Sequence, residues 1–302
     1  MKNRALVFIK PHAITEKFIQ FVEGFLAEKN ITLTEPRRIS AGEIKKRGIV
    51  DRHYFAIAGT AVFSTPKEYN LGSDSRKKFE EAFGTSWDDA LEERKILNSA
   101  EAQKRAGNIS GIELNEIWQK SSQVKMAPGL YAGYFEAQDI YCINGFYPGQ
   151  REVFTSDGAE VVMYEAEFSP EEVSWEQFRQ EIIGATDPQK AAPGSLRSLL
   201  LQRFIDFGLT SQPLMSKNGV HASAGPLEGL RERIVWLDTD PDDDEFAGRL
   251  YAGGLDRNDL DALLENPVVT LGNQTGPVFD LTEDLDGPEA ADMLIQRFQR
   301  NK

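Results

Sequence analysis

The chain begins with apolar and polar blocks that predict a strand, a turn and a helix. Ala5 to Ile9 is a continuous apolar run, which is typical of a buried strand. Thr15 is a favourable N-cap residue, and the apolar positions that follow it have helical spacing: Phe18, Ile19, Val22, Phe25 and Leu26. A second extended run, Ile31 to Ile39, precedes a helical stretch from Ile44 to Tyr54. This part of the chain therefore predicts a β-α-β-α unit.

From about residue 59 to residue 128 the pattern becomes polar and charged, with short helical periodicities. We interpret this stretch as an insertion that has its own helices. Strand patterns return at Gly129 to Tyr134, at Asp139 to Ile143 and at Glu160 to Phe168, where apolar residues face both sides of the predicted strand.

Helices dominate the remaining pattern. Ser169 and Pro170 predict a helix start, and the apolar spacing continues to Gly184. A further helix is predicted from Leu196 to Phe207, and another begins at Pro226. Beyond Trp236 there are three short helical patterns, at residues 246–250, 260–264 and 290–298. We expect a main domain over residues 1–237 and a small C-terminal helical extension over residues 238–302.

Charge excludes some classes of partner. With 34 Lys and Arg against 48 Asp and Glu, the formal net charge is −14, so neither nucleic acid nor an anionic membrane would be attracted at long range. Part of this acidity lies between Asp238 and Glu245, which lacks the glycine and distal glutamate of an EF-hand. We interpret that run as a solvated linker.

The single cysteine, Cys142, excludes an internal disulfide and a cysteine-based metal cluster. The N-terminal run has no signal-peptide pattern, and no apolar run approaches the length of a membrane span. These features favour a cytoplasmic location. His12 and His53 are not at metal-ligand spacing from another histidine or cysteine, so no protein-held metal is expected.

The segment Asn218 to Ser223 is the strongest chemical signal, because it places His221 among small residues just before the helix at Pro226. A neutral imidazole is a nucleophile near pH 7, and the N-terminal end of a helix favours an anion. A structural histidine is the alternative. Lys10, Thr186 and Arg197 lie at ends of predicted strands, loops or helices, where a cation or hydroxyl suits a polyphosphate. A solvated surface role is the alternative for Lys10 and for Arg197.

These pieces occur in a specific order. Ile9-Lys10-Pro11 is followed by His53-Tyr54, by Gly184-Ala185-Thr186-Asp187-Pro188, by Pro193 to Arg197, and finally by Asn218 to Ser223. In this order the chain resembles the nucleoside diphosphate kinase family, whose pieces are IKP, HY, G-x-T-[ND]-P, PG-[ST]-[IL]-R and N-x-x-H-[GA]-S. The resemblance covers Arg4 to about Tyr54 and Tyr141 to Leu237, and it extends to long, atypical members of the family.

The resemblance implies an α+β fold: a ferredoxin-like βαββαβ arrangement with an antiparallel four-stranded sheet and surrounding helices, here joined by the helical insertion and the C-terminal extension. It also implies a ping-pong reaction in which His221 takes the γ-phosphate of a nucleoside triphosphate and passes it to a nucleoside diphosphate. His221, Glu232 and Lys10 would be the catalytic set, with Glu232 orienting the imidazole. The nucleotide and its phosphates would be bound by Lys10, Tyr54, Tyr147, Arg179, Thr186, Arg197, Asn218 and Ser223. Mg²⁺ would be held mainly by the phosphates and water.

Three departures from the family pattern affect these expectations. Gln180 stands where the family has an arginine, and Arg179 lies one position earlier, about 100° around a helix. The insertion replaces one wall of the nucleotide cleft. The connection from Arg197 to Asn218 is long and lies where family members make subunit contacts, so a homo-oligomer is possible but a hexamer is not assumed.

Three functions therefore remain open. The first is nucleoside diphosphate kinase activity, with nucleoside tri- and diphosphates as partners. The second is a phospho-histidine kinase on the same scaffold whose acceptor is not a nucleotide. The third is a nucleotide-binding regulatory or scaffold protein with little turnover.

Overall fold

The computed structural model describes residues 1–300, with side chains up to residue 297, and divides into two compact units. Unit 1 combines residues 1–40 with the chain from residue 160 onward, and unit 2 is residues 41–159. The insertion expected at residues 59–128 lies within unit 2, whose borders are wider on both sides. The expected extension, residues 238–302, is part of unit 1, and its last two residues lie outside the described ones.

Unit 1 is built on an antiparallel five-stranded sheet with the order β2-β8-β1-β9, in which β3 also pairs with β8. The strands are β1 (Asn3–Ile9), β2 (Thr32–Leu33), β3 (Arg37–Ser40), β8 (Glu160–Phe168) and β9 (Val220–Ala222). If β2 and β3 are counted as one interrupted edge strand, the chain runs βαββαβ in the order 2-3-1-4, with every neighbouring pair antiparallel. This is the ferredoxin-like arrangement that the family resemblance implied.

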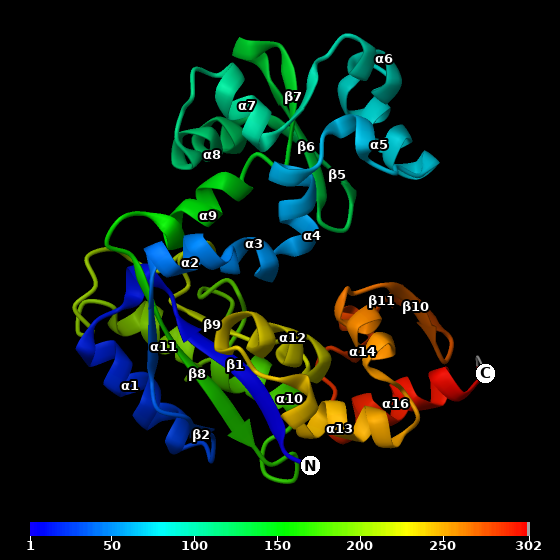
Figure 1. Ribbon diagram of the computed structural model, residues 1–302. Coiled ribbons are helices and arrows are strands. Elements are labelled where there is room, and N and C mark those ends of the chain that lie inside the picture. The colour runs from blue at the N-terminus through cyan, green and yellow to red at the C-terminus, as the bar shows by residue number, and fades with distance from the viewer. Residues whose placement is uncertain (301–302) are drawn as a thin grey trace. The chain divides into compact units, whose positions relative to one another are not determined.

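Helices cover both faces of this sheet (Figure 1). The helices before the C-terminal segment are α1 (Glu16–Ala27), α10 (Trp175–Gln177) with the π-helical stretch Phe178–Ile183, α11 (Leu196–Arg203) and α12 (Pro226–Leu237). Val7 and Ile9 pack in one core with α1, the helix 175–183 and α11. Phe8, on the opposite face of β1, contacts Trp236 of α12 at a centroid distance of 4.7 Å.

The sequence placed one helix start wrongly. The helix expected from Ser169 and Pro170 begins at Trp175, and its N-cap is Ser174, whose side chain accepts a hydrogen bond from the Gln177 backbone. Ser174 and Gln177 form a reciprocal capping box, which satisfies the backbone N–H groups of both residues at the start of the helix.

The C-terminal segment contains α13 (Glu245–Ala252), α14 (Arg257–Leu264), the hairpin β10 (Val268–Leu271) and β11 (Gln274–Pro277), α15 (Val278–Thr282) and α16 (Gly287–Arg300). The three helices expected there are confirmed as α13, α14 and α16. The hairpin and α15 were not predicted, because these strands are short and lack clear alternation of apolar residues.

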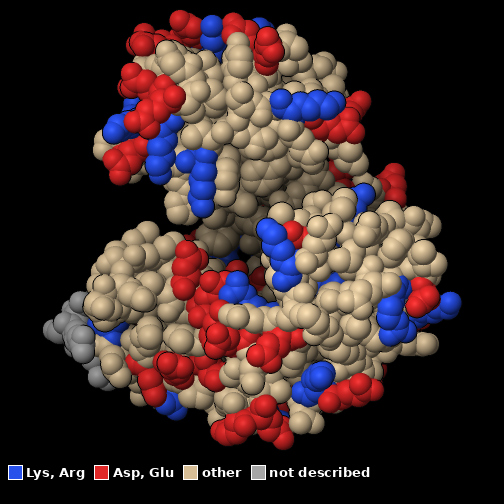
Figure 2. All heavy atoms as spheres, turned by 180° about the vertical axis from the view of Figure 1, so that it is seen from behind, with Lys and Arg blue, Asp and Glu red and all other residues tan. Residues whose placement is uncertain are grey.

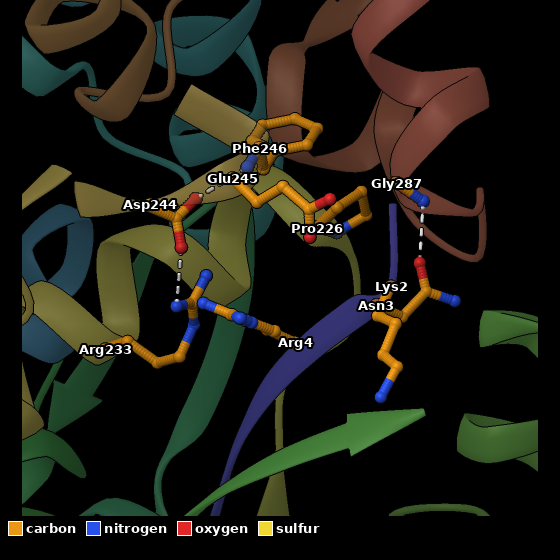
Figure 3. A pocket seen from close by; sticks show the side chains of 9 residues that line it. All are labelled: Lys2, Asn3, Arg4, Pro226, Arg233, Asp244, Glu245, Phe246 and Gly287. Atoms are coloured by element: carbon orange, nitrogen blue, oxygen red, sulfur yellow. Dashed lines mark hydrogen bonds and ion pairs between the residues drawn. The ribbon is translucent and has the colours of Figure 1, made fainter. Parts of the chain in front are cut away.

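A buried ion pair attaches this segment to α12, and it corrects the interpretation of the acidic run as a solvated linker. Asp244 is 3% exposed and pairs with Arg233 at 2.8 Å. Its other oxygen accepts hydrogen bonds from the backbones of Phe246 and Ala247. Figure 3 shows this contact in a recess that is also lined by the start of β1. Asp242 and Asp243 are exposed, as expected.

Unit 2 has its own four-stranded sheet, in the order β4-β7-β6-β5, with β4 and β7 parallel. Its strands are β4 (Ile96–Asn98), β5 (Ser122–Ala127), β6 (Leu130–Phe135) and β7 (Ile140–Ile143). Its helices are α2 (Ala41–Arg47), α3 (Ile49–His53), α4 (Phe55–Ala58), a π-helical stretch Gly59–Phe63, α5 (Ser73–Phe83), α6 (Trp87–Glu92), α7 (Ser99–Arg105), α8 (Gly111–Lys120) and α9 (Tyr147–Thr155).

Two hydrophobic clusters hold unit 2 together, one on each face of its sheet. Phe79 of α5 and Trp87 of α6 pack against one face, and Leu114 and Trp118 of α8 pack against the other (Figure 1). Cys142 belongs to the second cluster, where burial raises the pKa of its thiol. Unit 2 therefore has the core of an independent domain.

Acidic side chains outweigh basic ones on the face drawn in Figure 2, and the two signs are interspersed, in keeping with the net charge of −14. Among the described residues, no helix is both long and apolar enough to cross a bilayer.

Candidate active site

His221 lies in β9, the short edge strand of unit 1. It pairs across the sheet with Phe8 of β1, and the two rings stack at a centroid distance of 4.6 Å. The His221 side chain is 18% exposed, so it is held by packing and still reaches solvent. Lys10 follows Phe8 by two positions, and because side chains alternate along an extended chain, Lys10 and His221 project to the same side of the sheet.

A carboxylate fixes the imidazole of His221. Glu232 Oε1 lies 2.8 Å from His221 Nε2, and Glu232 Oε2 accepts a hydrogen bond from the Ser223 hydroxyl at 2.5 Å. Ser223 also accepts a hydrogen bond from the Leu6 backbone at 2.9 Å. Glu232 is 4% exposed, and both of its oxygens are engaged. A carboxylate at Nε2 favours the tautomer with its proton on Nε2 and its lone pair on Nδ1.

Lys10 connects two loops of the site. Its ammonium group donates to Asn218 Oδ1 at 2.7 Å, and the Asn218 amide donates to the Thr186 carbonyl at 2.9 Å. Burial, together with the nearby Arg197 guanidinium, lowers the pKa of Lys10 to about 8. Two cations this near to each other would be stabilised by an anion placed between them. Thr186 itself is exposed.

The turn before His221 requires glycine at position 219. Gly219 has a φ of +82°, and a Cβ atom there would lie 2.1 Å from Leu200 Cδ2. Its carbonyl accepts a hydrogen bond from the Lys10 backbone at 2.8 Å. Its N–H donates to His12 Nε2 at 3.2 Å. These two bonds hold the Asn218 loop against the end of β1.

His12 was missed as a site residue, because a histidine after Lys-Pro has no pattern of its own. Burial, with Lys10 and Lys217 nearby, lowers the pKa of His12 to about 4. The ring is therefore neutral near pH 7, as a hydrogen-bond acceptor for the Gly219 backbone must be.

Arg197 is buried and bonded to the backbone, which the sequence did not predict. It is 9% exposed, and its guanidinium donates to the Gly184 carbonyl at 2.7 Å and to the Val220 carbonyl at 2.9 Å. Val220 adjoins His221. Arg197 thus supports the histidine strand and contributes positive charge beside Lys10.

Arg179 and Gln180 contact the C-terminal segment. Arg179 pairs with Glu283 and, at 3.0 Å, with Asp284. Gln180 donates to the other oxygen of Asp284 at 3.1 Å. The arginine expected to replace the family's phosphate ligand is therefore held by two carboxylates of its own chain.

Tyr54 and Tyr147 belong to unit 2, whereas the residues described above belong to unit 1. Tyr54 ends α3, and its ring makes an edge contact with His53 at 4.3 Å. Tyr147 is fully buried, and its hydroxyl donates to Asp51, which also pairs with Arg151. A ring packed in this way has no face open to a nucleobase, so we do not propose base stacking for Tyr147.

Solved structures similar to this chain include several nucleoside diphosphate kinases. One from Encephalitozoon cuniculi has 16% identity and a TM-score of 0.38, over 79% of this chain and 90% of that chain. One from Aquifex aeolicus has 13% identity and a TM-score of 0.38, over 78% and 94%. One from Borrelia burgdorferi, described as a transition state mimic with bound vanadate and ADP, has 14% identity and a TM-score of 0.36, over 78% and 86%. No family model matches the chain. Because these scores are low, the strand topology, and not the superposition, defines the fold.

Proposed function

We propose that the protein transfers the γ-phosphate of a nucleoside triphosphate to a nucleoside diphosphate through a phosphorylated His221. The observation that carries the proposal is the pairing of His221 Nε2 with a buried carboxylate, Glu232, at 2.8 Å, on the side of the sheet to which Lys10 projects. The order of motifs that resembles the nucleoside diphosphate kinase family supports the same chemistry.

The proposed first half-reaction needs positioning and charge more than proton transfer. The Nδ1 lone pair of His221 attacks the γ-phosphorus, the N–P bond forms, and the bond to the β,γ-bridging oxygen breaks, so that the diphosphate leaves. Glu232 compensates the positive charge that develops on the ring. Lys10 and Arg197 contribute positive charge toward the phosphates, with Thr186 and Asn218 at the same loops. The second half-reaction reverses these steps on a new diphosphate.

We place magnesium on the triphosphate and water. Both oxygens of Glu232 already accept hydrogen bonds, from His221 and Ser223, so this carboxylate suits a role on the histidine better than one on the metal. When bound, Mg²⁺ would neutralise part of the phosphate charge.

The test is incubation of the full chain with γ-³²P-ATP and magnesium, followed by a chase with several nucleoside diphosphates. We expect acid-labile label that is absent in His221→Ala and that passes to the diphosphates. Lys10→Ala and Arg197→Ala should both slow labelling. No label on the wild-type protein would contradict the proposal and favour a nucleotide-binding regulatory or scaffold role.

One observation favours a second candidate, a phospho-histidine kinase with another acceptor. Arg179 is paired with Glu283 and Asp284, and Gln180 is bonded to Asp284. The phosphate-binding arginine of the family is therefore replaced by Gln180, and Arg179 already has carboxylate partners. Label that forms on His221 but that no diphosphate discharges would support this candidate.

A further inference from the structure

The C-terminal segment reaches the candidate active site through residues Thr282 to Gly287, which we name the acidic strap. The strap joins α15 to α16 and carries Glu283, Asp284 and Asp286. Thr282 is fully buried, and its hydroxyl donates to the Val278 carbonyl at 2.9 Å. The strap is therefore fixed at its start.

The strap lies directly against the turn that follows His221. The Asp284 N–H donates to the Ala224 carbonyl at 3.1 Å. A Cβ atom on Gly225 would lie 2.7 Å from the Thr282 carbonyl oxygen and 3.2 Å from Glu283 Cα. Gly225 has an extended backbone, with a φ of −165°, which any residue adopts. Its small size is thus explained by the approach of the strap.

The other side of the strap is bound to the helix 175–183 and to β1. Asp286 accepts hydrogen bonds from the Trp175 backbone at 2.8 Å and from the Asn3 amide at 2.7 Å. The Gly287 N–H donates to Asn3 Oδ1 at 2.7 Å, in the recess that Pro226 also lines (Figure 3). Trp175 in turn donates from its indole to the Ser223 carbonyl at 3.3 Å.

These contacts connect the strap to His221 through a series of hydrogen bonds. The strap holds Ala224 directly and Ser223 through Trp175, and Ser223 holds Glu232, which holds His221. Arg179 forms ion pairs with both Glu283 and Asp284, and so it anchors the strap to the helix. Without that cation the two carboxylates would repel each other.

We propose that the acidic strap positions the His221 loop, with Arg179 as its anchor and not as a phosphate ligand. The proposal rests on the proposed role of His221. Arg179, Asp284 and Asp286 are then positioning residues, which act through Ser223, Ala224 and Glu232. A displaced strap should slow phosphorylation of His221 even when nucleotide is saturating, because a shift of the nucleophile by about 1 Å is costly to in-line attack.

Gly225→Ala tests the contact itself, because the added methyl group must push the strap or the loop aside. We expect the labelling rate at saturating ATP to fall about tenfold. Gly248→Ala is the matched control, since a Cβ atom there meets nothing within 4 Å and the residue lies in α13 of the same segment. Its labelling rate should equal that of the wild type.

Arg179→Gln separates the two roles of this arginine and changes a side chain that is 36% exposed. An anchor predicts a lower saturating rate with an unchanged half-saturating ATP concentration. A phosphate ligand predicts a higher half-saturating concentration with an unchanged saturating rate, and that result would overturn the proposal.

A second readout needs no nucleotide. The chain has 3 histidines, so ¹⁵N-histidine NMR resolves the His221 ring, which is assigned by its loss in His221→Ala. We expect Gly225→Ala and Arg179→Gln to shift these ring signals, and Gly248→Ala to leave them in place. If the wild type takes no label, the proposed function fails, but this measurement still tests the strap. Unchanged ring signals in both strap variants, or faster labelling, would overturn the inference.

Discussion

The fold lowers the pKa of Lys10 into a range in which its charge can be titrated. Its pKa is lowered to about 8 by burial and by Arg197, so most of the side chain is charged at pH 7 and it loses its proton as the pH rises through 8. We expect the dissociation constant for ATP to increase above pH 8, by up to about tenfold per pH unit, as measured by titration calorimetry.

Lys10→Arg is the control for this pH dependence, because a guanidinium stays charged throughout the accessible range. Its dissociation constant should stay nearly constant between pH 7 and pH 9. An equal pH dependence in Lys10→Arg would assign the effect to another group.

Glu228, one helical turn before Glu232 in α12, has a pKa raised to about 8 by burial and by the nearby carboxylates of Glu232 and Glu283. The folded state therefore keeps a proton that the unfolded chain loses above pH 4.5, and the free energy of unfolding decreases as the pH rises from about 5 to 8. Glu228→Gln should remove this loss and be more stable at pH 9 by about 1–3 kcal/mol.

Urea unfolding at pH 5 and pH 9 measures this difference. Glu172→Gln is the control, since Glu172 is an exposed glutamate of the same unit, and it should change stability equally little at both pH values. A Glu228→Gln variant with wild-type pH dependence would show that the carboxyl group ionises normally.

At the scale of residues, the sequence indicated candidate side chains more readily than the contacts that those side chains make. The loop from Asn218 to Ser223 was singled out by its own pattern, and Glu232 only by the family resemblance. Asn218 contacts Lys10, which lies 208 positions away. Arg179 could not be placed, because Glu283 and Asp284 lie more than a hundred positions away and no local pattern links an arginine on a helix to a distant turn.

Among the elements, α13 depends most on a single side chain. Asp244 caps its first turn and also neutralises Arg233, whose side chain is 1% exposed. Asp244→Ala leaves that buried cation with Glu165 at 3.0 Å as its remaining ion-pair partner among the described residues. We expect the free energy of unfolding to fall by about 3–5 kcal/mol, as measured by urea unfolding.

Asp243→Ala is the matched control, since Asp243 is exposed in the same acidic run, and it should change stability by less than about 0.5 kcal/mol. Equal effects of the two substitutions would mean that the buried pair contributes little.

Helices whose apolar residues have a regular helical spacing were predicted well. All five apolar positions expected on α1 are buried, and α12 begins at Pro226 as expected. The failures have a common physical cause, which is competition between similar local signals. Ser169 and Ser174 are both suitable N-caps, and each has a capping-box residue three positions later, Glu172 and Gln177. The helix begins after the second. The acidic run looked solvated because its one buried member, Asp244, has its partner on another helix.

For the whole molecule, the division into two units predicts that unit 1 folds after unit 2 is deleted. Ser40 and Glu160 face each other in the β3–β8 pairing, so a two-residue Asn-Gly turn in place of residues 41–159 would close an ordinary hairpin. We expect this shortened chain to unfold cooperatively, as measured by circular dichroism. It should still label on His221, because Lys10, Ser223 and Glu232 all lie in unit 1.

Aggregation or loss of the cooperative transition would contradict this prediction and would mean that unit 1 needs unit 2 to fold. The control is the same turn inserted between Ser40 and Ala41 in the full chain, which tests whether the added residues alone disturb the edge of the sheet.

The backbone bond from Ala41 N–H to the Ala159 carbonyl, 2.8 Å long, has a consequence for the order of folding. An unfolded stretch between β3 and β8 would add about 3 kcal/mol of loop-closure entropy to the pairing of these strands. Once unit 2 has folded, its two ends are already adjacent, and β3 and β8 meet as neighbours. A core defect in unit 2, far in sequence from His221, should therefore slow the refolding of the sheet that carries the histidine.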